Sequence, residues 1–215
     1  MACRADNAMN TFISQLMGRM TLEEKIGQLN LLPGGDIVTG KEMDSPLARL
    51  TAEGKLGAVL SLRDPVKIKA LQDIAVKKSR LGIPLLFGYD VIHGFQTVLP
   101  IPLAQACSWD TTAIRRGAAM AARECTSQGI DWVYSPMVDI ALDPRWGRIA
   151  ESSGEDPFLG SAIAKVMVEG LQGNYGPENA MACLKHYALY GAVAAGRDYN
   201  TVDMSEMMFR ERHLP

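Results

Sequence analysis

The stretch Pro84-Leu85-Leu86-Phe87-Gly88-Tyr89-Asp90 decides the fold of this 215-residue chain. It is a short, almost uninterrupted apolar run that ends in a carboxylate, and a loop that ends in glycine follows at 91–94. Uninterrupted apolar runs of this length are typical of strands that are buried on both faces, as in parallel sheets. The pattern predicts a buried strand whose polar residue lies at its carboxyl end.

Similar apolar runs occur on both sides of this stretch, and segments with helical periodicity separate them. An alternation of strand and helix predicts a parallel sheet that is covered by helices. The predicted strands cover 56–62, 84–90, 132–138 and 181–187, and the predicted helices cover 65–80, 110–128, 157–173 and the start of one more at 205–213.

The N-terminal part of the chain, residues 8–32, predicts a helix followed by an extended turn, which Pro33-Gly34-Gly35 ends. Thr21 and Glu24 stand three residues apart, which is the spacing of a capping box at the start of a helix. We therefore expect a helix start at this position.

Four strand–helix units amount to about half of a (β/α)₈ barrel, which typically has ~250 residues. The sequence therefore predicts an α/β fold, namely the N-terminal part, about four βα units, of a TIM-type (β/α)₈ barrel. A half barrel leaves two unpaired sheet edges, which favour aggregation. We therefore expect the chain to be a fragment of a longer protein.

The composition excludes several classes of partner. The net charge is −2, from 22 basic and 24 acidic residues, with no long basic run, so we expect no nucleic-acid partner. No apolar stretch reaches the ~20 residues of a membrane span. The four cysteines are widely spaced, which fits neither a zinc site nor a disulfide scaffold.

Asp90 is the first candidate for ligand binding. A carboxylate at the end of a strand can accept two hydroxyl hydrogen bonds from one sugar, and such charge-assisted bonds are strong. The structural alternative is that Asp90 caps the turn that follows. For the nearby His93, a structural role, with its ring bonded to a loop carbonyl, is the more frequent one.

The stretch Asp143-Pro144-Arg145-Trp146-Gly147-Arg148 places two guanidinium groups in the loop after the third predicted strand. Guanidinium groups bind carboxylates or donate to sugar oxygens. We expect one of them to tie the loop down through an ion pair with an acidic neighbour, and we favour a structural role for Arg145. Glu155 and Asp156 precede a proline, so helix capping and loop ion pairs with Arg145 are favoured over acid catalysis.

Lys185 and His186 end the fourth predicted strand. Adjacent residues of a strand point to opposite faces, so both reach one ligand only where the strand is interrupted, for example by a non-proline cis peptide or a bulge. Alternatively, Lys185 is an exposed charge and His186 a buried, hydrogen-bonded ring. The polar loop 196–200 receives no role from its pattern.

Together these patterns resemble glycoside hydrolase family 3, in particular its branch of periplasmic bacterial β-glucosidases. The resemblance implies an N-terminal (β/α)₈-type barrel with glucose bound at the carboxyl ends of the strands. Its −1 subsite residues match Asp90, Arg148, Lys185 and His186, and the last two normally follow a cis peptide. The stretches that carry the resemblance are Met20 to Gln28, Tyr89 to Gly94, Ser135 to Ile140, Asp143 to Arg148, Glu151, Gly154 to Pro157, Lys185 to Tyr187 and Gly196 to Tyr199.

The resemblance also implies which catalytic groups are missing. A retaining member needs a nucleophile and an acid/base roughly 5–5.5 Å apart. The family's nucleophilic aspartate lies in a Ser-Asp-Trp-like motif, which is absent here, since Ser108-Trp109-Asp110 has another order. Its acid/base glutamate comes from a following domain. We therefore expect no catalytic residue in this chain, no metal and no cofactor.

On this resemblance residues 1–19 form an N-terminal extension and the start of the first helix, and residues 20–215 form a partial family 3 barrel domain. The implied activity of the parent is that of a retaining β-glucosidase, with a β-xylosidase or a non-catalytic carbohydrate-binding fragment as alternatives. The implied partners are a β-glucoside or oligosaccharide and the remaining barrel and C-terminal domains. The implied location is periplasmic or secreted, although residues 1–6 show no signal-peptide pattern.

Two rival families fit less well. A metal-dependent amidohydrolase barrel would use a lysine such as Lys185 and several histidines, but the chain has three histidines and no His-x-His motif. Metal ligation by His93, His186 and Asp90 is therefore not expected. The N-acetylhexosaminidase branch carries a histidine where Tyr190 stands in this chain.

Overall fold

The structure is a computed structural model that describes residues 7–34 and 46–215. Its Cα positions group into two compact units, Met1–Phe87 and Gly88–Pro215. Both are built from short parallel strands and helices, which confirms the predicted α/β class. The Gly35 expected to end the first element lies outside the described residues.

The first unit begins with two helices rather than one. Thr21 separates them, and its capping box is confirmed, because Thr21 Oγ1 accepts from Glu24 N (3.2 Å) and Glu24 Oε2 accepts from Thr21 N (2.9 Å). The predicted extended turn is the strand β1, parallel to β2, with Leu32 opposite Val59. The elements of this unit are α1 (Asn7–Arg19), α2 (Leu22–Gln28), β1 (Leu31–Pro33), α3 (Pro46–Ala52), β2 (Ala58–Leu60) and α4 (Pro65–Lys78).

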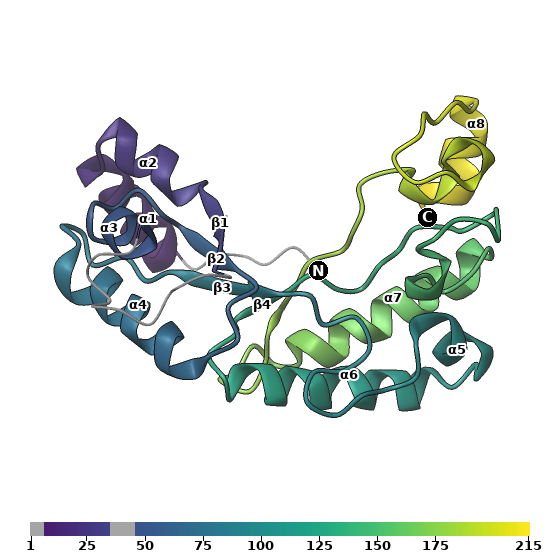
Figure 1. Ribbon diagram of the computed structural model, residues 1–215, viewed down its shortest axis with the longest axis horizontal. Helices are drawn as coiled ribbons and strands as arrows, with labels where there is room; N and C mark the ends of the chain where they lie inside the picture. Colours follow the sequence, from purple (N-terminus) through teal and green to yellow (C-terminus); the bar gives the residue numbers. More distant parts are fainter. Residues whose placement is uncertain (1–6, 35–45) are drawn as a thin grey trace. The chain divides into compact units, whose positions relative to one another are not determined.

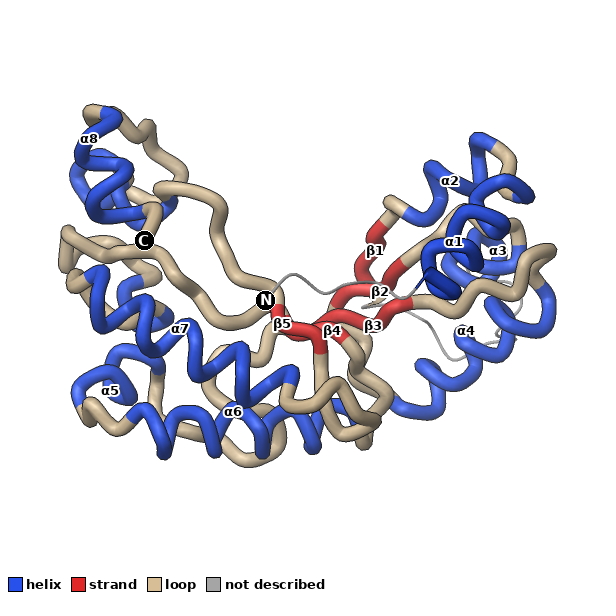
Figure 2. Tube along the Cα trace, turned by 180° about the vertical axis from the view of Figure 1, so that it is seen from behind, coloured by secondary structure: helices blue, strands red, loops and turns tan. Residues whose placement is uncertain are grey.

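The second unit contains the remaining strands. Strand β3 (Leu86–Tyr89) crosses the boundary between the units, and its Gly88 lies opposite Trp132 of β4, which in turn lies opposite Met181 of β5. All of these pairs are parallel, and the three strands lie side by side (Figure 2). The elements that follow β3 are α5 (Pro102–Cys107), α6 (Thr111–Thr126), β4 (Trp132–Val133), α7 (Pro157–Gln172), β5 (Met181–Ala182), α8 (Glu206–Met208) and a π-helical turn (Phe209–His213).

The predicted elements are all found, but the strands are shorter and more numerous than expected. The strand prediction at 132–138 corresponds to a strand of two residues, because the chain turns into an irregular loop after Val133. Strand β1 was not predicted, since it has three residues and ends in proline. Helices α3 and α5, with seven and six residues, were not predicted either.

Helices α6 and α7 pack side by side and, with α5, form one of the apolar clusters of the second unit (Figure 1). Ile114 of α6 and Ile163 of α7 are both buried in one cluster. The two helices approach closely at Gly170, where a Cβ atom would lie 2.4 Å from the Arg115 carbonyl oxygen. This packing fixes α7, whose first turn lies beside the loops described next. Among the described residues no helix is both long and apolar enough to span a bilayer.

Candidate functional site

The loops after β3 and β5 meet through an ion pair between two predicted site residues. Lys185 Nζ donates to Asp90 Oδ1 at 2.7 Å. The Lys185 side chain is 14% exposed, so the alternative that it is an exposed charge is wrong. The Asp90 side chain is 53% exposed and keeps an open face. The pair therefore presents a carboxylate and an ammonium group side by side.

His186 is held by Asp139, which lies in the loop after β4. Asp139 Oδ2 accepts from the His186 backbone N (3.0 Å) and lies 2.8 Å from His186 Nδ1. The peptide between Lys185 and His186 is cis, so the cis bond lies within the pair, and not before it as the resemblance implies. The two loops run alongside each other: Val138 N donates to Lys185 O at 2.7 Å, and Met137 and Lys185 form a parallel bridge. His186 is thus hydrogen-bonded but only partly buried.

Arg148 reaches the other side of the His186 ring. Its Nη1 lies 3.4 Å from His186 Nε2, while Nε and Nη2 donate to the two Glu151 oxygens at 2.7 and 2.8 Å. The guanidinium group beside Glu151 lowers the pKa of that carboxyl, and the Glu151 carboxylate raises the pKa of Arg148. Arg148 is therefore a permanent cation held in one orientation.

The four residues predicted to bind the ligand form one continuous series of contacts. Asp90 binds Lys185, Lys185 is bonded to His186 along the chain, and His186 contacts Arg148. The set offers carboxylate and imidazole acceptors together with ammonium and guanidinium donors. Such a mixture is suited to a ligand with several hydroxyl groups, each of which both donates and accepts.

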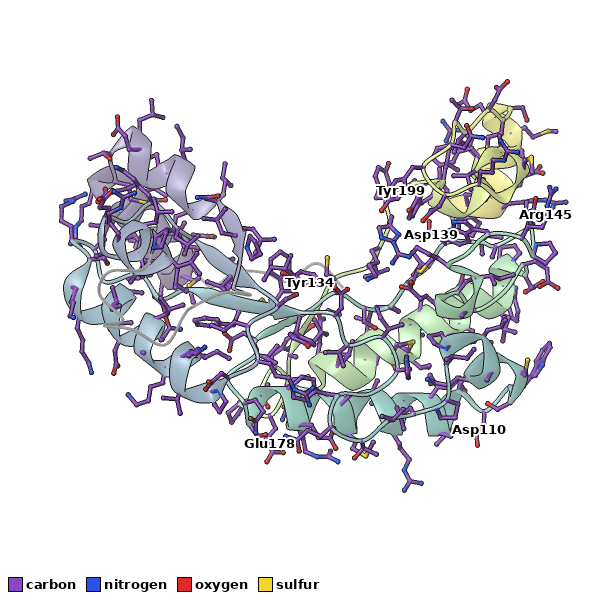
Figure 3. The ribbon with its side chains drawn as sticks, in the orientation of Figure 1. Asp110, Tyr134, Asp139, Arg145, Glu178 and Tyr199 are labelled. Atoms are coloured by element: carbon purple, nitrogen blue, oxygen red, sulfur yellow. The ribbon has the colours of Figure 1, made fainter. Side chains whose placement is uncertain are left out.

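The remaining polar residues of these loops have structural contacts. Arg145 points away from the site (Figure 3), and its Nη2 pairs with Asp143 Oδ2 at 2.6 Å. Its hydrogen bonds lower the pKa of Asp143 to about 2. The expected pairing of Arg145 with Glu155 and Asp156 is wrong, because Asp143 is nearer in the turn. Asp156 caps α7, as predicted, by accepting from Leu159 N at 2.7 Å.

Two residues behind the site were not predicted from the sequence. Tyr190 packs edge-on against the His186 ring, with ring centroids 4.8 Å apart. Asp198, in the loop that received no role, accepts from Trp146 Nε1 at 3.1 Å. The position of Asp139 after the third predicted strand could have indicated a role at the site. Its contact with His186 could not be predicted, because the two residues are 47 apart in the sequence.

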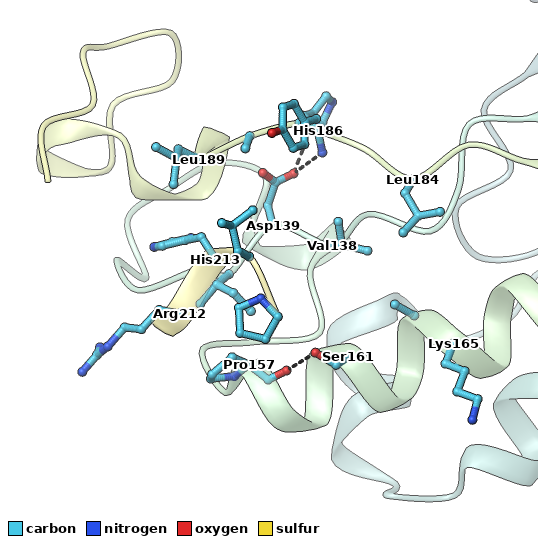
Figure 4. Close-up of a pocket in the computed structure, with 17 residues that line it drawn as sticks. Val138, Asp139, Pro157, Ser161, Lys165, Leu184, His186, Leu189, Arg212 and His213 are labelled. Carbon is cyan, nitrogen blue, oxygen red and sulfur yellow. Dashed lines mark hydrogen bonds and ion pairs between the residues drawn. The ribbon is translucent and has the colours of Figure 1, made fainter. Parts of the chain in front are cut away.

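A cavity of about 390 Å³ lies beneath the Asp139–His186 pair (Figure 4). Its walls come from the start of α7, around Pro157 and Ser161, and from the last residues of the described chain. Of the four predicted ligand-binding residues, His186 alone lines it. The cavity therefore adjoins the set of contacts and does not contain it.

The loop after Asp90 is anchored to α6 by Glu124. Its carboxylate accepts from the backbone N of Gln96 (2.8 Å) and Thr97 (2.9 Å) and from Thr97 Oγ1 (2.6 Å). In the same loop His93 Nδ1 lies 3.0 Å from the Leu99 carbonyl oxygen, which confirms the structural contact expected for His93. These bonds position the segment that begins at Asp90.

Glu124→Gln is expected to lower stability by roughly 1 kcal/mol at neutral pH, after discounting charge-assisted bonds for solvent screening. The bonds from Thr97 lower the folded-state pKa of Glu124. A lowered pKa gives stability that is present above the unfolded value of about 4.3 and is lost as the pH falls through the folded value. Urea midpoints across this range measure the effect.

The control for this prediction is Glu178→Gln, which removes a carboxylate from an exposed position of the same unit (Figure 3). Wild type and Glu124→Gln are expected to converge in stability at acid pH, whereas Glu178→Gln follows the wild type throughout. An equal difference between wild type and Glu124→Gln at every pH would contradict the charge-based explanation.

Parallel strands with polar residues in the loops at their carboxyl ends define a TIM-barrel-like α/β domain. The chain belongs to glycosyl hydrolase family 3: residues 21–215 match the family's N terminal domain. This finding confirms the resemblance drawn from the sequence.

Individual relatives agree with this assignment. The chain is 38% identical to the periplasmic beta-glucosidase of Salmonella typhimurium, over 97% of this chain and 27% of that protein. It is 31% identical to a periplasmic beta-glucosidase/beta-xylosidase of Dickeya chrysanthemi, over 94% and 35% of the two chains. The crystal structure of a beta-glucosidase from Listeria innocua in complex with glucose superimposes with a TM-score of 0.86 at 41% identity, covering 95% of this chain and 30% of that one. The chain thus spans about a third or less of these relatives.

Proposed function

We propose that this chain supplies the glucose-binding part of the active site of a family 3 β-glucosidase. The reaction is the hydrolysis of terminal, non-reducing β-D-glucosyl residues by retaining double displacement. The observation that supports this proposal most directly is the series of contacts from Asp90 through Lys185 and His186 to Arg148, at the carboxyl ends of parallel strands. Relatives named as β-glucosidases support the choice of sugar.

In this proposal the four residues hold the sugar in the −1 subsite. The Asp90 carboxylate accepts from two hydroxyl groups, and Lys185 and Arg148 donate to sugar oxygens. Bonds to hydroxyl groups that strengthen as the ring distorts contribute several kcal/mol in glycosidases. The role of these residues is therefore to bind the distorted ring more tightly than the relaxed one.

The two catalytic carboxylates come, on this proposal, from outside the 215 residues. The Ser-Asp-Trp-like motif of the family's nucleophile does not occur among them, and the chain spans 27% of the Salmonella relative. The remaining barrel and a further domain would supply the nucleophile and the acid/base. We also propose a periplasmic or secreted location, as in the relatives named periplasmic.

The protein that carries this chain is expected to hydrolyse p-nitrophenyl β-D-glucoside, and the first sugar released should be the β-anomer. Retention follows from two successive displacements at the anomeric carbon. Proton NMR during the first turnovers identifies the anomer, and p-nitrophenyl α-D-glucoside serves as the control substrate. No hydrolysis, or release of the α-anomer, would overturn the proposal. Faster cleavage of the β-xyloside would move the assignment to a β-xylosidase.

A further inference from the structure

We propose that Asp139 is a positioning residue that holds His186 as the neutral tautomer with its proton on Nδ1. Nε2 is then left as a hydrogen-bond acceptor on the ligand side of the ring. The inference rests on the proposed function, because it takes the sugar to contact His186. It adds a residue that the sequence did not mark for binding.

The contacts of the Asp139 side chain support this role. The side chain is 1% exposed, and its Oδ2 alone faces both the backbone N and the ring Nδ1 of His186, at 3.0 and 2.8 Å. An ionised carboxylate only accepts hydrogen bonds, so both His186 atoms act as donors toward it. The backbone bond fixes the position of His186, and the ring bond fixes the rotation of the imidazole.

The contact at the other ring nitrogen, Nε2, independently favours the tautomer with the proton on Nδ1. Arg148 Nη1 lies 3.4 Å from His186 Nε2, and a guanidinium group only donates. Nε2 therefore presents its lone pair, and the ring is neutral with its proton on Nδ1. Glu151 holds Arg148 through two bonds, and the Tyr190 ring packs edge-on against the imidazole, so the arrangement is supported from several sides.

The Arg148 Nη1 contact with Nε2 is long, at 3.4 Å, so a sugar hydroxyl can replace it while Arg148 donates to the sugar instead. A hydroxyl that takes this place at Nε2 must donate its proton, because Nε2 carries only a lone pair. The four ligand-binding residues divide into two acceptors, Asp90 and His186, and two donors, Lys185 and Arg148. A fluorine atom in place of the hydroxyl that faces His186 cannot donate, so this substitution in the substrate should be penalised. The penalty should depend on Asp139, because Asp139 sets the tautomer.

The test compares Asp139→Leu with Asp139→Asn in the protein that carries this chain. Leucine has a similar size but no acceptor, and it is expected to lower kcat/KM for the aryl β-glucoside by about 100-fold. The asparagine carbonyl can replace Oδ2 as acceptor of both bonds, so Asp139→Asn is expected to stay within about fivefold of wild type. Asp156→Asn, which keeps a good N-cap on α7, is the matched control and should leave kinetics unchanged.

Introducing Asp139→Leu into a His186→Ala variant shows whether Asp139 acts by positioning His186 or by supporting the fold in general. If Asp139 acts through His186, adding Asp139→Leu to His186→Ala changes kcat/KM by less than about threefold, because the two effects are not additive. Full additivity, or an equal loss in Asp139→Asn and Asp139→Leu, overturns the proposal. Asp139→Ala replaces the leucine variant if circular dichroism shows that the latter is unfolded.

Substrates in which one ring hydroxyl at a time is replaced by fluorine give a second readout. In wild type one position should carry a penalty that disappears in His186→Ala and shrinks in Asp139→Leu. A pattern of penalties that is identical in all variants overturns the proposal. If the wild-type protein hydrolyses no β-glucoside at all, the proposed function fails first, which keeps the two failures distinct.

Discussion

Replacing Asp90 with alanine is expected to lower kcat/KM for an aryl β-glucoside by about 1,000-fold, equivalent to roughly 4 kcal/mol of transition-state stabilisation. The carboxylate is more than half exposed and lies 2.7 Å from Lys185 Nζ. Removal takes away the acceptor for sugar hydroxyls and also leaves the ammonium group without its counter-ion. Steady-state kinetics with p-nitrophenyl β-D-glucoside measure the loss.

Two variants show whether this loss belongs to ligand binding. Asp90→Asn keeps an acceptor without the charge, so it should lose less, on the order of 10- to 100-fold. Asp73→Ala removes another lysine-paired aspartate, at 2.9 Å from Lys69 Nζ on the exposed face of α4, and should leave kinetics within about twofold. Kinetics of Asp90→Ala within about threefold of wild type would remove Asp90 from the proposed subsite.

The regular elements of this fold could be predicted from the sequence where they are long. Helices α4, α6 and α7 have 14 to 16 residues, so their apolar periodicity is repeated several times. Strand β1 and helix α5 are too short to show a period, and their form depends on neighbours elsewhere in the chain. The runs predicted as strands at 132–138 and 181–187 cover seven residues each, but the two paired strands contain two residues each. Beyond them the regular pairing is interrupted, and among the described residues it returns only as a single parallel bridge between Met137 and Lys185.

The site could be predicted only in part for a similar reason. The Arg148–Glu151 ion pair joins residues three apart, so an acidic partner for one arginine could be expected from local spacing. The Asp139–His186 pair joins residues 47 apart, and the Lys185–Asp90 pair joins residues 95 apart. These contacts depend on which strands are neighbours, which sequence periodicity does not specify. The partners of Asp90 and His186 therefore required the structure.

Gly57→Ala is expected to destabilise the protein by roughly 3 kcal/mol, at the upper end of what overpacking usually costs. Gly57 precedes β2, and a Cβ atom there would lie 2.2 Å from the Gln28 carbonyl oxygen and 2.8 Å from its Cα atom. Both are backbone atoms at the end of α2, so no side-chain rotation can relieve the clash. The Gly57 and Ala58 N–H groups also donate to the Asn30 carbonyl oxygen at 3.1 Å, and a backbone shift would weaken both bonds. The urea midpoint and slope of the first unfolding transition give the free energy of unfolding.

Gly18→Ala is the matched control, since it is the same chemical change in the same unit. No atom lies within 4 Å of the position that a Cβ would take at Gly18, which is exposed near the end of α1. Alanine is favoured over glycine in a helix by up to about 1 kcal/mol, so this variant should be equal to wild type or slightly more stable. The difference in free energy of unfolding between the two variants measures the effect of the close approach between α2 and the segment before β2. The general effect of replacing glycine with alanine is removed by the comparison. Equal stability of the two variants would show that this approach can relax, and that the glycine at position 57 is not required by packing.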